Sequence, residues 1–246
     1  MEIELSLVMD RISSRSDFIP YLKKIHNFLL ETSILGDNFS SYYLQVDDME
    51  NATEYKMPQD FEQFYSMLAS QGEAPNDEEN FYILGLWNGN MDFLTASEGD
   101  WINSFSLIIS LSADNNGNIS RDYKENIDFC FLAGDKNEYG ERKRIAEKII
   151  EISISSLPFK YATFIDRKYI SYYDGMPGII IGGSLYCIKS ELDAVKGFRR
   201  QVSEDIEEIS PVQGYFDIHN PEHIQKAHKF EEELLQNHQF RQLLLR

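Results

Sequence analysis

Residues 81–89 read Phe-Tyr-Ile-Leu-Gly-Leu-Trp-Asn-Gly, and this segment decides how the rest of the chain is interpreted. The run is almost continuously apolar, and Asn88 and Gly89 close it. An apolar run bounded by turn residues is typical of a strand buried on both faces. Asn-Gly is also a strong signal for a two-residue hairpin, because both residues tolerate a positive φ. We therefore expect 81–88 to be a central strand that leads into a tight turn.

The composition is that of a folded protein. The chain has 246 residues, of which 42% are hydrophobic and 13% aromatic, and this argues against disorder. That length allows one large domain or two small ones. The N-terminus lacks a basic region followed by an apolar one, and the apolar runs are shorter than the roughly 18 residues of a membrane span. We therefore expect a cytoplasmic protein that does not enter a membrane.

The charge balance is strongly acidic. The chain has 23 Lys and Arg against 41 Asp and Glu, a formal net charge of −18. Such a chain repels a phosphate backbone, so we do not expect it to bind nucleic acid directly. The charge favours instead a basic protein partner, or mimicry of nucleic acid in front of one.

Periodic patterns predict helices and strands that interleave along the chain. Ile3, Leu5 and Leu7 alternate with polar residues, as in a half-buried strand. Asn220, Pro221 and Glu222 form a strong helix start, with a cap, a proline at N1 and an acid at N2. Strands are predicted at 2–12, 40–46, 81–88, 101–113, 127–133, 161–166, around 179–188 and at 213–218; helices are predicted at 16–35, from Pro58 through Leu68, at 141–155 and at 220–236, with short helices in 189–211.

Several predicted strand pairs are joined by connections too short for a crossover, and 103–113 and 126–133 are expected to pair antiparallel. The fold class is therefore predicted as α+β, a mostly antiparallel mixed sheet with helices packed against it. We expect a single large domain over 1–246, with two possible sub-halves at about 1–135 and 136–246.

Two clusters are considered as sites for small ligands. His223 and His228 are about 140° apart around the predicted helix, and His219 precedes its cap, so the three do not fit one metal ion. The glycines 175, 178, 182 and 183 flank a strand, and no phosphate-loop motif is present, so they are expected to permit turns or bulges. Cys130 and Cys187 are predicted to be buried, reduced thiols. We expect no metal, no cofactor and no catalytic residue.

Acidic residues gather in three segments. Charge runs of this kind are by default solvated surfaces, and the alternative is an acidic face that binds a partner. The candidate partner-binding residues are Asp47, Asp48, Glu50, Glu54, Asp77, Glu78, Glu79, Glu204, Asp205, Glu207 and Glu208. Those at 47–54 and 77–79 precede the segment 81–89 in the chain, and the residues of 81–89 themselves are expected to hold the sheet rather than to touch a partner.

Two distant segments carry a family resemblance. Gly214-Tyr215-Phe216-Asp217 leads into Asn220-Pro221-Glu222-His223 and then Ala227, Glu231 and Leu234. Together with Gly85-Leu86-Trp87-Asn88-Gly89, this arrangement resembles the immunity protein 52 family of bacterial polymorphic toxin systems. The chain departs from that pattern by an Asn- and Asp-rich insertion around 114–118 and by its acidic, alanine-poor composition.

The resemblance implies a non-enzymatic protein that binds and neutralises a cognate toxin in the producing cell. Toxins paired with this family are often nuclease-like, and a nuclease presents a basic cleft that an acidic protein can occlude. Two alternatives stay open: an enzyme with a site near Gly175–Gly183, and a non-catalytic scaffold or oligomerising protein. The sequence does not fix the oligomeric state.

Overall fold

The computed structural model describes most of the chain. The described residues are 1–10, 12, 14–36, 39–44, 54–75, 81–88, 105–112, 125–172, 181–189, 192 and 195–245. Contacts divide the chain into two compact units. Unit 1 consists of Met1–Leu7, Leu132–Glu151 and Lys160–Arg246, and unit 2 of Val8–Phe131 and Ile152–Phe159. The prediction of one domain with two possible halves stays a prediction.

The fold class is α+β, as predicted. Seven strand pairs have a described register, and all seven are antiparallel. One of them is the predicted pairing of 103–113 with 126–133, in which Ile108 lies opposite Asp128. Among the described residues no helix is long and apolar enough to cross a membrane.

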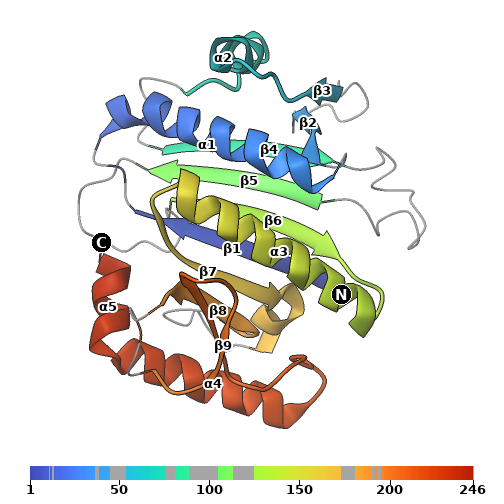
Figure 1. The fold of residues 1–246 in the computed structure, drawn as a ribbon, viewed down its shortest axis with the longest axis vertical. Helices are drawn as coiled ribbons and strands as arrows, with labels where there is room; N and C mark the ends of the chain where they lie inside the picture. Colours follow the sequence, from blue (N-terminus) through green and yellow to red (C-terminus); the bar gives the residue numbers. More distant parts are fainter. Residues whose placement is uncertain are drawn as a thin grey trace. The chain divides into compact units, whose positions relative to one another are not determined.

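Unit 2 is built on a sheet in the order β3-β2-β4-β5-β6. The strands are β2 (Ser41–Leu44), β3 (Glu54–Lys56), β4 (Phe81–Asn88), β5 (Phe105–Ser112) and β6 (Asn126–Leu132). Helix α1 (Phe18–Thr32) crosses one face of this sheet (Figure 1), where the Phe28 and Phe129 rings lie 6.2 Å apart. Its inner residues Leu22, Ile25 and Leu29 are fully buried at the predicted helical spacing, so the helix predicted at 16–35 is confirmed in its main part.

The strand β4 is buried on one face only. Tyr82, Leu84 and Leu86 are buried, but Ile83 is 54% exposed, and Ile108 on β5 is 36% exposed. The prediction that 81–88 is buried on both faces is therefore wrong, because an antiparallel sheet needs a covering layer on one side only. The predicted two-residue hairpin is also wrong: Asn88 pairs with Phe105, so the connection is 89–104, which lies outside the described residues.

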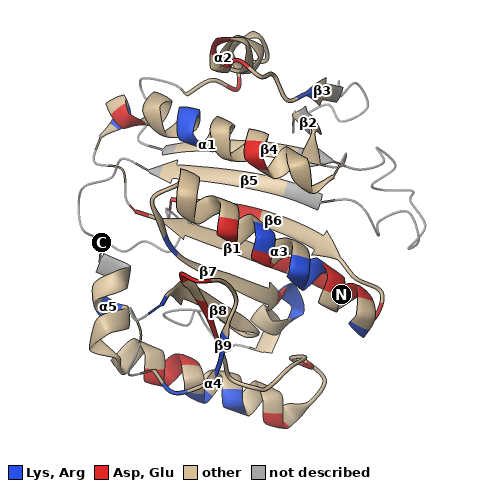
Figure 2. Ribbon diagram, viewed as in Figure 1, with Lys and Arg blue, Asp and Glu red and all other residues tan. Residues whose placement is uncertain are grey.

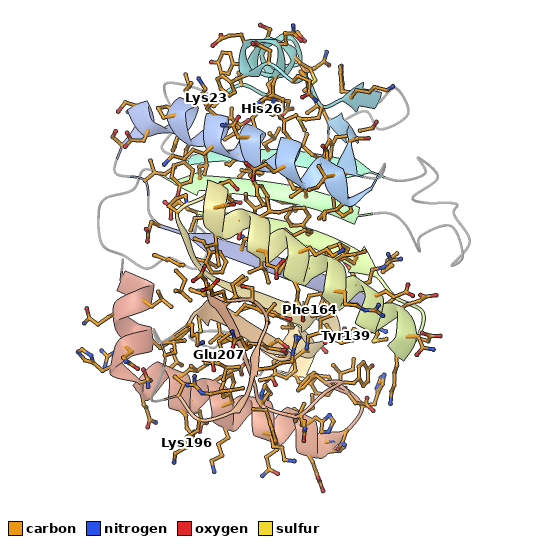
Figure 3. The ribbon with its side chains drawn as sticks, viewed as in Figure 1. Lys23, His26, Tyr139, Phe164, Lys196 and Glu207 are labelled. Carbon is orange, nitrogen blue, oxygen red and sulfur yellow. The ribbon has the colours of Figure 1, made fainter. Side chains whose placement is uncertain are left out.

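Helix α2 (Phe61–Ser70) packs against α1 in unit 2. Lys23 and His26 point from α1 toward it (Figure 3): the His26 ring stacks on Phe64 at 4.8 Å, and the Lys23 ammonium lies 5.9 Å from the Phe61 ring centre. The helix begins after Asp60, not at Pro58 as predicted. The Asp60 carboxylate accepts hydrogen bonds from two backbone amides of the first turn, so the cap decides where the helix begins.

Replacing Asp60 by alanine should lower the free energy of unfolding by about 1 kcal/mol, because two amides of the first turn lose their acceptor. Chemical denaturation of the full chain measures this. Pro58→Ala is the matched control and should change stability less, since Pro58 precedes the helix. A larger loss for the proline variant would show that Pro58, not Asp60, sets the helix start.

Unit 1 contains a second run of strands, in the order β1-β7-β8-β10-β9. They are β1 (Glu2–Met9), of which residues 2–7 belong to this unit, β7 (Phe159–Asp166), which belongs to it from Lys160 on, β8 (Ser184–Ile188), β9 (Phe198–Gln201) and β10 (Ile206–Ser210). The predicted alternation of β1 is confirmed, with Ile3, Leu5 and Leu7 fully buried. The helices are α3 (Lys136–Ser156), which belongs to this unit up to Glu151, α4 (Pro221–Gln236) and α5 (His238–Leu245).

The strand buried on both faces is β7. All eight of its residues are buried, including the polar Lys160 and Thr163. Phe164 points toward Tyr139 of α3 (Figure 3), with ring centres 5.4 Å apart. Tyr161, which alternation places on the opposite face, lies 5.8 Å from Phe240 of α5. Helices therefore cover β7 on both sides within unit 1.

Three predictions for the second half of the chain fail. The short helices expected in 189–211 are instead the antiparallel hairpin β9–β10. The strand expected at 213–218 does not pair, because Phe216 and Ile218 pack into a core cluster with Tyr169 and Ala227. Helix α3 begins at Lys136 rather than at 141, since the Asp135 carboxylate caps its first turn, and α5 was not predicted.

The predicted start of α4 is confirmed. The Asn220 side chain accepts a hydrogen bond from the Glu222 amide at 3.0 Å, and Pro221 is the first helical residue. The Asp217 amide donates to His223 Nδ1 at 3.0 Å, which ties the preceding segment to the first turn of the helix. The segment Asp217–His223 is thus a local capping structure.

Candidate functional site

The chain leaves β2 and enters β4 at the same end of the unit 2 sheet. Asp47, Asp48, Glu50, Asp77, Glu78 and Glu79 lie outside the described residues, and Glu54 is the first residue of β3. β2 ends at Leu44, which pairs with Leu86, and it therefore runs toward the start of β4. β4 begins at Phe81, opposite the last residue of β5. The Tyr82 hydroxyl donates to the Glu73 carbonyl at 2.9 Å and anchors the chain at this end.

Most of the net negative charge belongs to unit 2. Its segments contain 21 Asp and Glu against 7 Lys and Arg, a net −14. Unit 1 contains 20 acidic against 16 basic residues, a net −4. The two units have similar numbers of acids, so the difference lies in the scarcity of lysine and arginine in unit 2. An extended acidic potential is therefore expected around unit 2.

The remaining predicted acids lie on the β9–β10 hairpin of unit 1. Glu204 and Asp205 are exposed near its turn. Glu207 is half-buried and forms an ion pair with Arg199 across the hairpin. Figure 2 shows basic and acidic residues close together on this hairpin and on α3. Of this group only Glu204 and Asp205 present exposed carboxylates.

Glu208 is an interior residue, so the expectation that it belongs to an exposed acidic face is wrong. It is 3% exposed. Its carboxylate accepts from Lys143 Nζ of α3 at 2.5 Å, from Ser184 Oγ of β8 at 2.6 Å, and from Arg200 Nε of β9 at 2.7 Å. Arg200 also pairs with Glu147. This cluster, which we call the Glu208 cluster, joins one helix to three strands.

The electrostatics of the Glu208 cluster favour the ionised carboxylate. Burial would raise the pKa of Glu208, but the Lys143 ammonium and the hydrogen bonds from Lys143 and Ser184, together with the Arg200 charge, lower it below its ordinary value. Sequence reasoning missed these partners, because Lys143 and Ser184 are 65 and 24 positions away from Glu208. No local pattern signals a contact at that separation.

The same cluster brings a serine and a lysine together, a pair that some hydrolases use as nucleophile and base. Lys143 Nζ lies 3.3 Å from Ser184 Oγ. The Lys143 ammonium forms an ion pair with the Glu208 carboxylate. Ser184 is 2% exposed, and its hydroxyl donates a hydrogen bond to the Glu208 carboxylate. The geometry is that of a structural ion pair.

Glu231 of α4 is a second buried carboxylate. It binds backbone amides next to the predicted cluster of glycines 175, 178, 182 and 183. Its Oε1 accepts from the Ile181 amide at 2.6 Å and the Gly182 amide at 3.0 Å, and its Oε2 accepts from the Tyr169 hydroxyl at 3.1 Å. Burial raises the pKa of Glu231 above its ordinary value. The three hydrogen bonds favour the ionised carboxylate and oppose that rise in part. The amides that an anionic ligand would use here already bind a protein carboxylate.

The described glycines of this segment have packing roles. Gly182 has φ +54°, and a Cβ added there would lie 2.7 Å from Tyr169 Cδ1. A Cβ on Gly183 would lie 2.4 Å from the Phe164 carbonyl oxygen. Both positions therefore need glycine for a turn and for close approach. Gly175 and Gly178 lie outside the described residues.

The three histidines have separate local roles. His219 is exposed, His223 Nδ1 accepts from the Asp217 amide, and the His228 ring lies 5.9 Å from Tyr169. Within the described part of the chain, no group of three or more His, Cys, Asp or Glu could hold a metal ion.

No family model matches this sequence, and no curated protein matches it.

Two features thus stand out by their geometry and charge. The carboxylates of Glu208 and Glu231 are buried, and donors within unit 1 hydrogen-bond to both. Unit 2 has the charge excess, and its sheet has the exposed isoleucines Ile83 and Ile108. A surface that recognises another molecule is therefore best sought in unit 2.

Proposed function

We propose that this chain is a cytoplasmic immunity protein that binds a cognate bacterial toxin and neutralises it by occlusion. The toxin is a basic, nuclease-like protein, and the chain itself performs no catalysis. The resemblance of 85–89 and 214–234 to the immunity protein 52 family supports this proposal. The main observation in favour of the proposal is the net charge of −14 on the 132 residues of unit 2.

A nuclease must attract a polyanion, so its active-site cleft is basic. An acidic partner is drawn to the same cleft, and complementary charge raises the association rate more than it raises the affinity. Fast capture suits a protein that must inactivate a toxin before the toxin reaches the genome. The acidic candidates are those of unit 2 at 47–54 and 77–79, together with Glu204 and Asp205 of unit 1.

The test is co-expression with the toxin encoded by the neighbouring gene. Cells that produce both proteins should survive, and the two purified proteins should elute together in gel filtration. The proposal fails if the toxin still kills and no complex forms.

Complementary charge also predicts a salt dependence. The association rate should fall by roughly tenfold or more between low and high salt, because screening shortens the reach of the charges. Stopped-flow mixing with the purified toxin domain measures this. Neutralising Asp47, Asp48 and Glu50 should slow association, whereas neutralising three exposed acids of unit 1 (Glu141, Glu151 and Glu232) should change it less. Equal effects of the two sets would contradict a role for unit 2.

A further inference from the structure

We infer that the partner contacts the open face of the unit 2 sheet, the side of β4, β5 and β6 opposite α1. This inference rests on the proposed function and names the surface that performs it. Its described residues are Ile83, Gly85, Ile108, Ser110, Asn126 and Asp128. The sequence placed the contact in the acidic segments beside β4 and assigned β4 itself to the core.

The strand register puts these residues on one face. Directly opposed residues of an antiparallel pair point to the same side of a sheet. Ile83 lies opposite Ser110, and Gly85 lies opposite Ile108. Ile108 in turn lies opposite Asp128. The two isoleucines are therefore diagonal neighbours, about 7–8 Å apart, with the small Gly85 and Ser110 between them.

The exposure of this face contrasts with the other side of the same strands. Leu84, Leu107 and Ile109 are fully buried on the α1 side, whereas Ile83 is 54% and Ile108 is 36% exposed. An antiparallel sheet face that is only solvated normally carries polar residues on its outer side. Asp128 is the single charged residue in the sequences of β4, β5 and β6. A centre that is poor in charged residues is typical of the core of a protein interface.

The charge of unit 2 identifies the class of occupant. A second copy of this chain would bring another −14 against the first, which opposes self-association through this face. A basic protein with an aliphatic or aromatic side chain at its centre fits both the charge and the two isoleucines. Three strands of about eight residues make a patch of roughly 25 by 10 Å. That is the size expected for the centre of a standard interface of about 800 Å² a side.

The decisive experiment compares two pairs of exposed isoleucines within unit 2. The variant Ile83→Ser/Ile108→Ser removes the apolar centre. The matched control Ile19→Ser/Ile34→Ser changes two residues of the α1 region that are 44% and 80% exposed. Binding to the purified toxin domain encoded by the neighbouring gene is measured by calorimetry. We expect the first variant to weaken binding at least tenfold and the control to change it less than twofold.

The outcomes separate this inference from the proposed function. If both variants bind like the wild type, the open face is not the contact and the immunity function stands. If the wild type does not bind, the proposed function falls and this inference falls with it. If light scattering shows a dimer that Ile83→Ser/Ile108→Ser dissociates, the face joins two copies and the inference is overturned.

The sign of a new charge adds an independent readout. Ile108→Glu and Ile108→Lys both remove the apolar contact, but only the lysine faces a basic partner with like charge. We expect Ile108→Lys to weaken binding several-fold more than Ile108→Glu. The opposite order would contradict a basic occupant.

Cys130 provides a probe of the unaltered chain. It lies opposite Ser106 on β5, two residues from Asp128 on the same face, and is partly exposed, whereas Cys187 is fully buried. N-ethylmaleimide should therefore modify Cys130 in the folded protein, and the bound toxin domain should slow this at least fivefold. Cys187 is the internal control and should react only on unfolding. An unchanged rate at Cys130 in the complex would overturn the proposed surface.

Discussion

Replacing Glu208 by alanine should lower the free energy of unfolding by about 3–5 kcal/mol, the usual cost of removing one partner of a buried ion pair. Lys143 would keep its charge with only 17% of its side chain exposed. Arg200, 50% exposed, would lose one of its two carboxylates and keep Glu147. Because Arg200 reaches water, the lower end of the range is expected. Urea denaturation at pH 7 measures the change.

The neighbouring residue offers the matched control. Glu207→Ala removes the ion pair with Arg199, whose side chain is 28% exposed, and should cost less than about 1 kcal/mol. Lys143→Met combined with Glu208→Leu should recover most of the stability, because an apolar pair leaves no buried charge. A Glu208→Ala variant as stable as Glu207→Ala would show that the cluster contributes nothing.

The pH dependence of this effect has a defined sign. The folded pKa of Glu208 is lowered, so its contribution is present above its unfolded pKa of about 4.3 and is lost as the pH falls through the lower folded value. The stability difference between the wild type and Glu208→Gln should therefore shrink as the pH is lowered below about 4.

Replacing Glu231 by alanine should cost about 3–5 kcal/mol, because the Ile181 and Gly182 amides and the Tyr169 hydroxyl lose their acceptor in a buried site. Glu231→Gln should cost much less at pH 7, within about 1 kcal/mol. Its carbonyl oxygen can accept from both amides, and its amide can donate to the Tyr169 oxygen. The exposed neighbour Glu232→Ala is the control and should be nearly neutral.

Glu231 and Glu208 should respond to pH in opposite ways. The folded pKa of Glu231 is raised by burial, so proton binding stabilises the folded state at low pH, and this contribution is lost as the pH rises through the folded pKa. The stability of Glu231→Gln relative to the wild type should therefore improve as the pH rises. A relative stability that is flat between pH 4 and 8 would mean that the pKa of Glu231 is not raised.

The elements that the sequence predicted well are those that a local pattern determines. The alternation of Ile3, Leu5 and Leu7 specifies β1, and the spacing of Leu22, Ile25 and Leu29 specifies α1. Asn220 and Pro221 specify the start of α4 through a cap and a fixed φ. Each of these signals acts within one or two turns of chain, so a single sequence contains all of it.

The elements that it predicted wrongly depend on partners far away in the chain. The run Phe81–Asn88 looks the same whether one or both of its faces are covered, and only α1 shows which face is inside. β7 contains Lys160 and Thr163, yet it is the strand with helices on both sides. The charged stretch 198–210 resembles surface helix, but Arg200 and Glu208 are cross-strand partners in a hairpin. The carboxylates of Glu208 and Glu231 were predicted as surface or motif residues, because their donors lie on other elements.

The division of the chain sets the order in which it can fold during synthesis. Unit 1 needs the first seven residues, and the rest of it begins only at Leu132 and ends at Arg246. The opening strand therefore leaves the ribosome long before most of the residues that bury Ile3, Leu5 and Leu7 exist. Contacts that close such long loops form slowly. We therefore expect this apolar strand to stay incompletely covered until residue 160 and beyond have emerged, and a chain truncated at residue 131 should lack the neighbour β7.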